Sequence, residues 1–283
     1  MSIGNKNAPY QNLCQVNNRG FEVTLGWSDT VNGFHYGISG NFTRNWNAVT
    51  KYNGRLEAGW VTDESGSRVY KTNIGDVSTV IDAARRTIEG KLINEYILAN
   101  VYNGSGEHFF ADGSVNPKGG PKDGMIRTPE DMAWLEAMVN AGNTFLPNKT
   151  IGKKGIWYGD YIYADVDGDG IYGNTYDNVF TGKSSTPKFT FGFQGSFGWK
   201  GLDLQFSFAG AAGFWLYWNE TGANNTGTRI GYNLLSSVAK DHYFYDPANP
   251  LDPRTNTTSK TARLTANEGN NQQGEKSTLH LYR

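Results

Sequence analysis

Several segments of the sequence alternate apolar and small polar residues over an unusual length. The clearest pair covers residues 188–199 and 202–210, separated by Lys200-Gly201. In the first of them the apolar positions are Phe189, Phe191, Phe193, Phe197 and Trp199. Because side chains of a strand point alternately to its two faces, a period of two predicts strands with one apolar and one polar face. The alternation runs for about 9 to 13 residues, which exceeds the usual ~5–6 and matches the ~9–11 of strands that cross a membrane in a barrel.

The same pattern occurs near the N-terminus, and a shorter alternating run ends the chain. Phe21, Val23, Leu25 and Trp27 alternate with small or polar residues, and Asn32-Gly33 is a strong hairpin signal. The sequence therefore predicts strands at about 11–29, 34–46, 188–199, 202–210 and 278–283.

The connections between these strands differ greatly in length. Those at 30–33 and 200–201 are very short, whereas 47–187 and 211–277 are very long. Outer-membrane barrels alternate short periplasmic turns with long extracellular loops, and long structureless loops are uncommon in soluble domains. We therefore expect an all-β fold: part of a large antiparallel transmembrane β-barrel, with long extracellular loops that contain short helices. A large soluble β-sandwich with one solvated face is the alternative.

The long loops contain their own helix signals. Thr128 is a predicted N-cap, followed by Pro129 and two acidic residues that suit a helix N-terminus. An apolar stripe then follows at Met132, Leu135, Met138 and Val139. A second short helix is predicted within 77–88.

Composition excludes several classes of protein. Of the 283 residues 36 are Gly, 14% are aromatic and only 19% are charged. Coiled coils, helical bundles and charge-driven disordered chains are therefore excluded. The net charge of −1 gives no indication of a nucleic-acid partner. No window approaches the ~18 apolar residues of a membrane-spanning helix.

One stretch has the spacing of a calcium-binding loop. It begins at Asp165 with acidic residues at alternate positions and a glycine at the sixth, as in the loop of an EF-hand. The candidate ligands are the side chains of Asp165, Asp167, Asp169 and Asp177 and the carbonyl of Ile171. Position 12 is Tyr176, so the terminal acid comes one residue late. A solvated Asp/Gly turn that closes on its own hydrogen bonds is the alternative.

Other candidate sites are weaker. Trp215, Tyr217 and Trp218 are candidates for stacking on sugar rings, or else belong to the aromatic girdle at a membrane edge. The acidic cluster resembles a glycosidase acid/base pair less than it resembles a metal loop. The histidines lack zinc-ligand spacing, and no serine lies in a G-x-S-x-G context. We therefore do not expect an enzyme.

Three motifs, taken together, resemble a known family. Residues 17–25 resemble the N-x-G-x-E strand of TonB-dependent outer-membrane receptors. Residues 159–170 resemble the GD-x-x-Y-x-D-x-(N/D)-G-D-G stretch of the SusC/RagA subgroup, and Pro187-Lys188-Phe189 matches the P-K-F that follows it there. Residues 89–96 are similar to the EGKP-type segment, although Leu92 stands in place of proline.

This resemblance implies an outer-membrane transporter of gut-type Bacteroidetes, built as a 22-stranded barrel around a plug domain. It also implies contact with TonB through the plug, a SusD-like surface lipoprotein over the extracellular loops, and oligosaccharides or peptides as cargo. We identify no signal sequence, plug or TonB-contacting segment, and the chain provides about five to seven strands, too few to close a barrel. It is therefore interpreted as the C-terminal barrel portion of such a transporter.

Two functional hypotheses follow. The first is nutrient import across a bacterial outer membrane, with outer-membrane lipid around the strands and Ca²⁺ as a candidate cofactor. The alternative is a secreted, calcium-stabilised β domain that binds carbohydrate.

Overall fold

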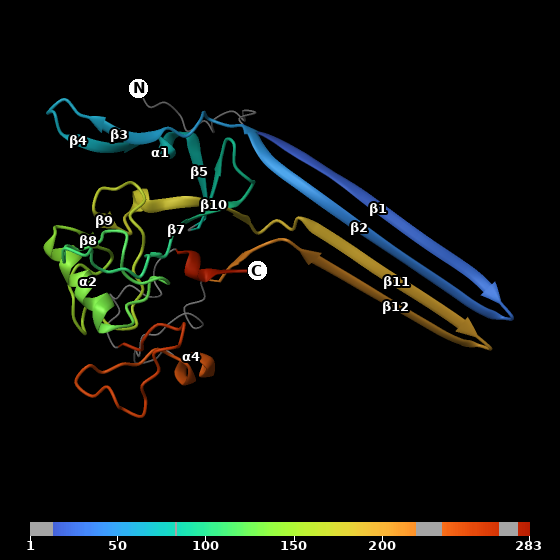
Figure 1. The fold of residues 1–283 in the computed structure, drawn as a ribbon. Coiled ribbons are helices and arrows are strands. Elements are labelled where there is room, and N and C mark those ends of the chain that lie inside the picture. The colour runs from blue at the N-terminus through green and yellow to red at the C-terminus, as the bar shows by residue number, and fades with distance from the viewer. Residues whose placement is uncertain (1–13, 83, 219–233, 266–276) are drawn as a thin grey trace, which may run out of the picture. The chain divides into compact units, whose positions relative to one another are not determined.

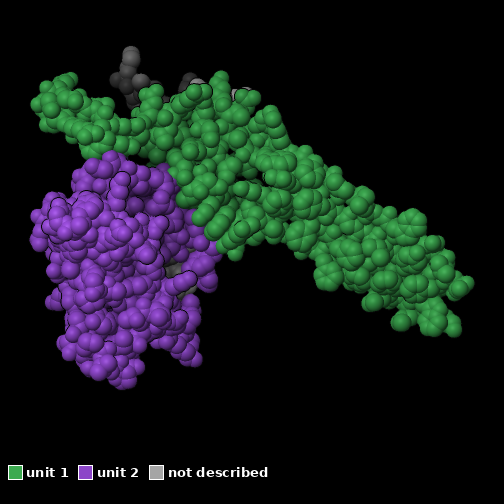
Figure 2. All heavy atoms as spheres, in the orientation of Figure 1, with its two compact units in different colours: residues 1–96, 180–216, 283 green, residues 97–179, 217–282 purple. Residues whose placement is uncertain are grey.

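The computed structural model describes residues 14–82, 84–218, 234–265 and 277–283. The chain divides into two compact units, which Figure 2 shows in green and purple. Unit 1 comprises residues 1–96, 180–216 and 283, and unit 2 comprises residues 97–179 and 217–282.

The main sheet of unit 1 consists of two long hairpins (Figure 1). Strands β1 (Gln15–Val31) and β2 (Phe34–Lys51) form one hairpin, and β11 (Phe189–Trp199) and β12 (Leu202–Ala212) form the other. β2 pairs with β11, so the four strands lie in the order β1-β2-β11-β12, and all neighbours are antiparallel. The first two strands extend further toward the C-terminus than the predicted 11–29 and 34–46.

Both hairpins close through two-residue turns with positive φ at each residue. The φ angles are 51° and 77° at Asn32 and Gly33, and 50° and 86° at Lys200 and Gly201. Positive φ at both central positions is the type I′ geometry, whose twist matches that of the flanking strands. Both turns are at the predicted positions.

The strand register gathers the apolar residues on one face of the sheet. One row across the four strands consists of Leu25, Gly40, Phe193 and Phe208, and the rows two residues away are also largely apolar. The other face carries Thr, Ser, Asn, Gln and Gly residues. Among the described residues the apolar face remains largely exposed, since Leu25 is 72% exposed and Phe208 is 65% exposed.

Glycines on the apolar face make room for phenylalanine rings. A Cβ atom at Gly195 would lie 2.3 Å from the ring of Phe206, and one at Gly210 would lie 2.5 Å from the ring of Phe191. In both cases the ring belongs to the residue directly opposite on the neighbouring strand. The rings therefore lie across the glycine backbone, which aligns the two strands of the hairpin.

Smaller sheets follow β2. Strands β3 (Ala58–Thr62) and β4 (Arg68–Thr72) form a hairpin. A second four-stranded sheet has the order β10-β7-β6-β5. Its strands are β10 (Asn178–Ser184), β7 (Glu95–Ala99), β6 (Arg85–Ile88) and β5 (Ser78–Asp82).

The helix predicted within 77–88 is wrong. Only the short α1 (Ile74–Val77) is helical, and the following residues form β5 and β6. Apolar residues in this region do recur at helical spacing, but many of its residues are β-branched. Val, Ile and Thr lose side-chain freedom in a helix and pack well in a sheet, so pairing between strands prevails.

The strand predicted at 278–283 is also largely wrong. Residues Thr278–His280 form a 3₁₀ turn, and only β14 (Leu281–Tyr282) is extended, where it pairs with β13 (Leu216–Tyr217). The Ser277 side chain accepts a hydrogen bond from the amide of Leu279. This local cap competes with strand pairing, as serine side chains commonly do.

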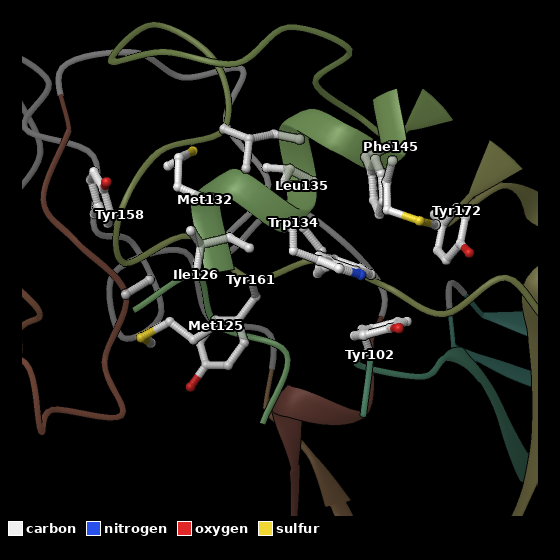
Figure 3. Close-up of a cluster of buried hydrophobic side chains, with 14 of the residues drawn as sticks. Tyr102, Met125, Ile126, Met132, Trp134, Leu135, Phe145, Tyr158, Tyr161 and Tyr172 are labelled. Carbon is white, nitrogen blue, oxygen red and sulfur yellow. The ribbon is translucent and has the colours of Figure 1, made fainter. Parts of the chain in front are cut away.

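Unit 2 has a buried core around one helix. Helix α2 (Pro129–Asn140) begins at the predicted cap: the Thr128 hydroxyl accepts from the amide of Asp131, whose carboxylate accepts from the amide of Thr128. The helix buries Trp134 and Leu135 completely (Figure 3). The core comprises Tyr102, Met125, Ile126, Met132, Trp134, Leu135, Met138, Phe145, Ile156, Tyr158, Tyr161, Ile162, Tyr172, Tyr243 and Ala262.

The core residues come from distant parts of the sequence. Phe145 in β8 (Thr144–Phe145) stacks on Tyr172 in β9 (Ile171–Tyr172), with ring centroids 4.5 Å apart. Tyr243 follows α4 (Ser236–Lys240) and donates a hydrogen bond to the carbonyl of Arg127. Much of the region predicted as long loops is thus a compact unit with its own core. No helix in the described part of the chain is both long and apolar enough to cross a membrane.

Candidate functional site

The predicted calcium loop lies in unit 2 and folds back on itself. It runs from Asp165 through β9 to the 3₁₀ turn η1 (Thr175–Asp177). Gly168, Gly170 and Gly173 have φ of 77°, 80° and 84°, a conformation that side chains rarely adopt. These left-handed residues reverse the chain repeatedly within the loop.

The first three acids each accept a hydrogen bond from a backbone amide a few residues ahead. Asp165 accepts from the amide of Gly170 at 3.0 Å, Asp167 from that of Asp169 at 3.1 Å, and Asp169 from that of Ile171 at 2.7 Å. Such bonds close successive turns of the loop and fix the positions of the carboxylates.

Three of the carboxylates converge. Asp165, Asp167 and Asp177 each place an oxygen within 4.8 Å of the others. Tyr176, at the position where an EF-hand has its terminal acid, is exposed, and η1 directs the next residue inward instead. The late acid thus reaches the cluster. Asp169 lies apart from these three, because its second oxygen accepts from the side-chain amide of Asn174 at 2.9 Å.

Asp177 is the structural anchor of the loop. It is fully buried, and its carboxylate accepts hydrogen bonds from the amides of Val166 at 2.6 Å, Gly173 at 2.8 Å and Asn174 at 3.0 Å. Burying an ionised carboxylate is energetically costly unless hydrogen bonds replace those it made with water, and these three amides supply them. Its position is therefore held by the backbone on both sides of the loop.

The cluster concentrates negative charge in a partly desolvated place. Burial is the main cause that raises the pKa of Asp167 to about 6; the charges of Asp169, Asp177 and Asp165 contribute to this rise, and the hydrogen bond from the Asp169 amide opposes it. Burial also raises the pKa of Asp177. An ion that neutralises this charge would stabilise the ionised loop.

The remaining candidate ligand is a backbone carbonyl. β9 pairs in parallel with β8 through the carbonyls of Gly170 and Tyr172, which accept from the amides of Thr144 and Leu146. The carbonyl of Ile171 lies between these two ladder carbonyls in the sequence. Successive carbonyls of a strand point to opposite sides, so this one is directed away from the ladder. The donor set is all oxygen, which suits a hard cation such as Ca²⁺.

The candidate sugar-stacking residues lie in different surroundings. Trp215 in unit 1 is half-buried, and the Lys183 ammonium lies 4.0 Å from the centroid of its ring. Tyr217 in unit 2 is half-buried, whereas Trp218 is 46% exposed and contacts the ring of Tyr282 edge-on. A cation already covers one face of Trp215, so Trp218 is the more accessible of the two tryptophans.

A buried ion pair and a carboxylate–imidazole contact in unit 2 were not predicted. The Asp160 carboxylate is fully buried and accepts two hydrogen bonds from Arg263, at 3.0 and 2.9 Å. Asp131 in the cap of α2 lies 2.7 Å from the imidazole of His108. The partners are 103 and 23 residues apart, so spacing along the sequence gives no signal for either pair.

The main sheet defines the class of protein to which the chain is similar. Long antiparallel strands with one apolar and one small polar face are the building unit of transmembrane β-barrels. The described strands form an open sheet and not a closed barrel.

The solved structures with this fold include chains of the RagAB peptide importer. The importer in its closed-closed state matches with a TM-score of 0.54 and 17% identity over 97% of this chain and 22% of that chain. A second structure, of the RagAB peptide transporter, matches with a TM-score of 0.54 and 18% identity over 99% and 22% of the two chains. The importer in its open-open state matches with a TM-score of 0.52 and 17% identity, over 97% of this chain and 21% of the importer chain.

These comparisons establish the fold of the chain. It spans about a fifth of the length of the importer chains it matches, at 22% and 21% coverage. No protein-family profile matches the sequence, and no curated protein matches it.

Proposed function

We propose that the chain is part of a TonB-dependent, SusC-like transporter that imports oligosaccharides or peptides across a bacterial outer membrane. The observation that carries this proposal is the main sheet of unit 1. Its register collects the apolar side chains of β1, β2, β11 and β12 on one face, and these side chains remain largely exposed in the part of the chain that the structure describes. Such a face suits lipid, and the small polar face suits a wet lumen.

The rest of the proposal rests on the resemblance of the sequence motifs to the SusC/RagA subgroup, and the similarity to the importer fold supports it. A SusD-like surface lipoprotein would contact the long loops, and TonB would supply energy through a plug domain in another part of the protein. The chain itself would act by binding and guiding cargo, without catalysing a reaction. Trp218 is the residue of the aromatic group best exposed for contact with a sugar.

Cysteine labelling tests the membrane proposal. The single Cys14 is first changed to serine, and Leu25→Cys and Thr24→Cys then place one label on each face of β1. In lipid bilayers a polarity-sensitive dye at position 25 is expected to report an apolar surrounding and to be quenched by lipid-borne nitroxides. The dye at position 24 is the matched control and is expected to report water. The proposal fails if the dye reports water at both positions. It also fails if the protein is found outside the membrane fraction, and that outcome favours the secreted carbohydrate-binding domain.

We further propose that the loop at 165–177 binds Ca²⁺ as a structural ion. Asp165, Asp167 and Asp177 would supply carboxylate oxygens, with the carbonyl of Ile171 completing the protein ligands. Support comes from the convergence of the three carboxylates and from the Asx-type turns that hold them. Asp169 would contribute by holding the turn and Asn174 in place.

Calorimetry with Ca²⁺ tests this second proposal. Asp167→Ala removes one ligand and one turn bond and is expected to weaken or abolish the binding heat. Asp112→Ala is the matched control, because Asp112 closes a similar turn on Ser114 elsewhere in unit 2. Titrations of the parent chain and the Asp167 variant that cannot be distinguished would exclude the metal site.

A further inference from the structure

Unit 2 contains a pocket of about 600 Å³ beside the core. None of the residues that line this pocket belongs to the candidate metal loop at 165–177. Two segments distant in sequence line it, 153–158 and 240–264. Both segments belong to the same compact unit, so the pocket is formed within unit 2. A volume of this size suits a ligand of a few residues or a drug-sized molecule.

One wall of the pocket is aromatic. The rings of Trp157 and Tyr158 meet edge-to-face with centroids 5.0 Å apart, and Tyr158 meets Tyr245 in the same way at 5.0 Å. Arg254 lies over the ring of Phe244 at 4.6 Å. These contacts occupy ring faces within the protein, which leaves less flat surface for a pyranose to stack on. The wall suits the insertion of an apolar side chain better.

Two of the four cations that line the pocket are held by carboxylates. Arg263 pairs with the buried Asp160, and Arg254 forms two hydrogen bonds with Asp252, at 3.0 and 2.8 Å. Asp246, the acidic residue in the lining, also acts on Arg254. The arginines and their acids are therefore part of the framework of the pocket.

The other two cations are lysines that keep their charge available. Lys153 and Lys240 both line the pocket and are exposed. Among the described residues, no carboxylate lies within ion-pair distance of either ammonium group. Two available ammonium groups beside an apolar wall attract an anion that also carries an apolar group.

We propose that this pocket binds a short acidic peptide, with carboxylates facing Lys153 and Lys240 and an apolar side chain against the aromatic wall. This inference deepens the proposed import function, on which the role of the peptide as cargo rests. The prediction that the peptide binds rests only on the residues that line the pocket, and not on the import function. Carboxylates of a uronic-acid oligosaccharide share the same charge, and the test separates the two sources.

Binding is measured by calorimetry on the full chain in detergent, with the acetylated and amidated tripeptide Glu-Phe-Glu as the probe. The neutral isostere Gln-Phe-Gln is expected to bind at least ten-fold more weakly, and Glu-Gly-Glu, which lacks the ring, is also expected to bind more weakly. Lys153→Ala and Lys240→Ala are each expected to weaken binding by roughly five-fold, the effect of losing one exposed ion pair. The affinity of the parent chain for Glu-Phe-Glu should decrease as the salt concentration rises. The affinity of the variant that carries both Lys153→Ala and Lys240→Ala should decrease less.

Two controls keep the result specific. Lys149→Ala removes an exposed lysine of unit 2 outside the pocket lining and is expected to leave binding unchanged. Lys153→Arg retains the charge and is expected to retain most of the affinity. Equal binding of Glu-Phe-Glu and Gln-Phe-Gln would overturn the proposal, as would unchanged binding in both alanine variants. Binding of a galacturonic acid trimer without binding of the peptide would overturn the peptide assignment.

The outcome is independent of the membrane test. Failure of peptide binding leaves the labelling of positions 24 and 25 in bilayers unchanged. Conversely, labels that both report water would remove the transport proposal while the calorimetric result on the pocket stands. The two failures are thus distinguishable.

Discussion

The two units use the same aromatic residues in opposite ways. Trp27 on the main sheet of unit 1 is 66% exposed, whereas Trp134 in unit 2 is 0% exposed and donates a hydrogen bond to the carbonyl of Asn116 at 2.8 Å. Unit 2 buries its rings against one another, whereas rings on the apolar face of the sheet, such as that of Phe208, remain largely exposed. Stability in unit 2 therefore depends on internal packing, while the sheet depends on its surrounding medium.

The largest effect is expected in the core of unit 2. Trp134→Ala removes the contacts with Tyr102 and Phe145, whose ring centroids lie 5.2 and 6.2 Å away, and leaves a cavity. We expect a loss of about 3–5 kcal/mol in the free energy of unfolding of unit 2. Urea unfolding of the chain in detergent measures it. Trp27→Ala is the matched control on the sheet, and an equal loss in the two variants would break the comparison.

A charge on the apolar face should affect the sheet almost as strongly, but only in a membrane. Leu25→Arg places a guanidinium in the middle row of the sheet and is expected to cost about 2–4 kcal/mol of stability in a bilayer. Thr24→Arg, on the polar face, should cost far less. Folding into vesicles, followed by urea titration, gives both values. Similar losses at the two positions would contradict a lipid-facing surface.

The close contact between Gly195 and Phe206 predicts a smaller loss. A side chain at position 195 must displace the ring, so Gly195→Ala is expected to destabilise the hairpin by about 1–3 kcal/mol. At Gly26 a Cβ would lie 3.6 Å from the nearest atom, an ordinary contact. Gly26→Ala is therefore the control, and the same unfolding assay compares them. No difference between the two would show that the ring adjusts without cost.

The smallest effect concerns the cap of α2. Thr128→Ala removes the acceptor for the amide of Asp131 and is expected to cost about 1 kcal/mol in unit 2. Thr128→Ser retains the hydroxyl and should restore most of the stability. Thermal unfolding of both variants measures the difference, and a serine variant as unstable as the alanine variant would argue against the cap.

Local features were predicted well from the sequence. The faces of the long strands, both two-residue turns and the start of α2 each depend on neighbouring residues, so their signals lie within a few positions. The helix within 77–88 failed because its apolar spacing fits a helix while its β-branched residues pair as strands. Spacing alone does not decide between two structures when propensity opposes it.

In the candidate metal loop, some features could be predicted from the sequence and others could not. The sequence offers Asp165, Asp167 and Asp169 as candidate ligands, but Asp177 falls one residue late. Only the folded loop shows that η1 turns this carboxylate inward and that Val166, Gly173 and Asn174 hold it there. The two lysines of the peptide pocket are 87 residues apart, and nothing in their spacing joins them.

The sequence by itself thus determined the long two-faced strands, because alternation of side chains is a property of the extended backbone alone. The tertiary structure decided that the intervening segments form a compact unit with its own core, a buried ion pair between Asp160 and Arg263, and a pocket. Such contacts depend on loop closure between residues far apart, and their free energy is gained only when all the partners meet.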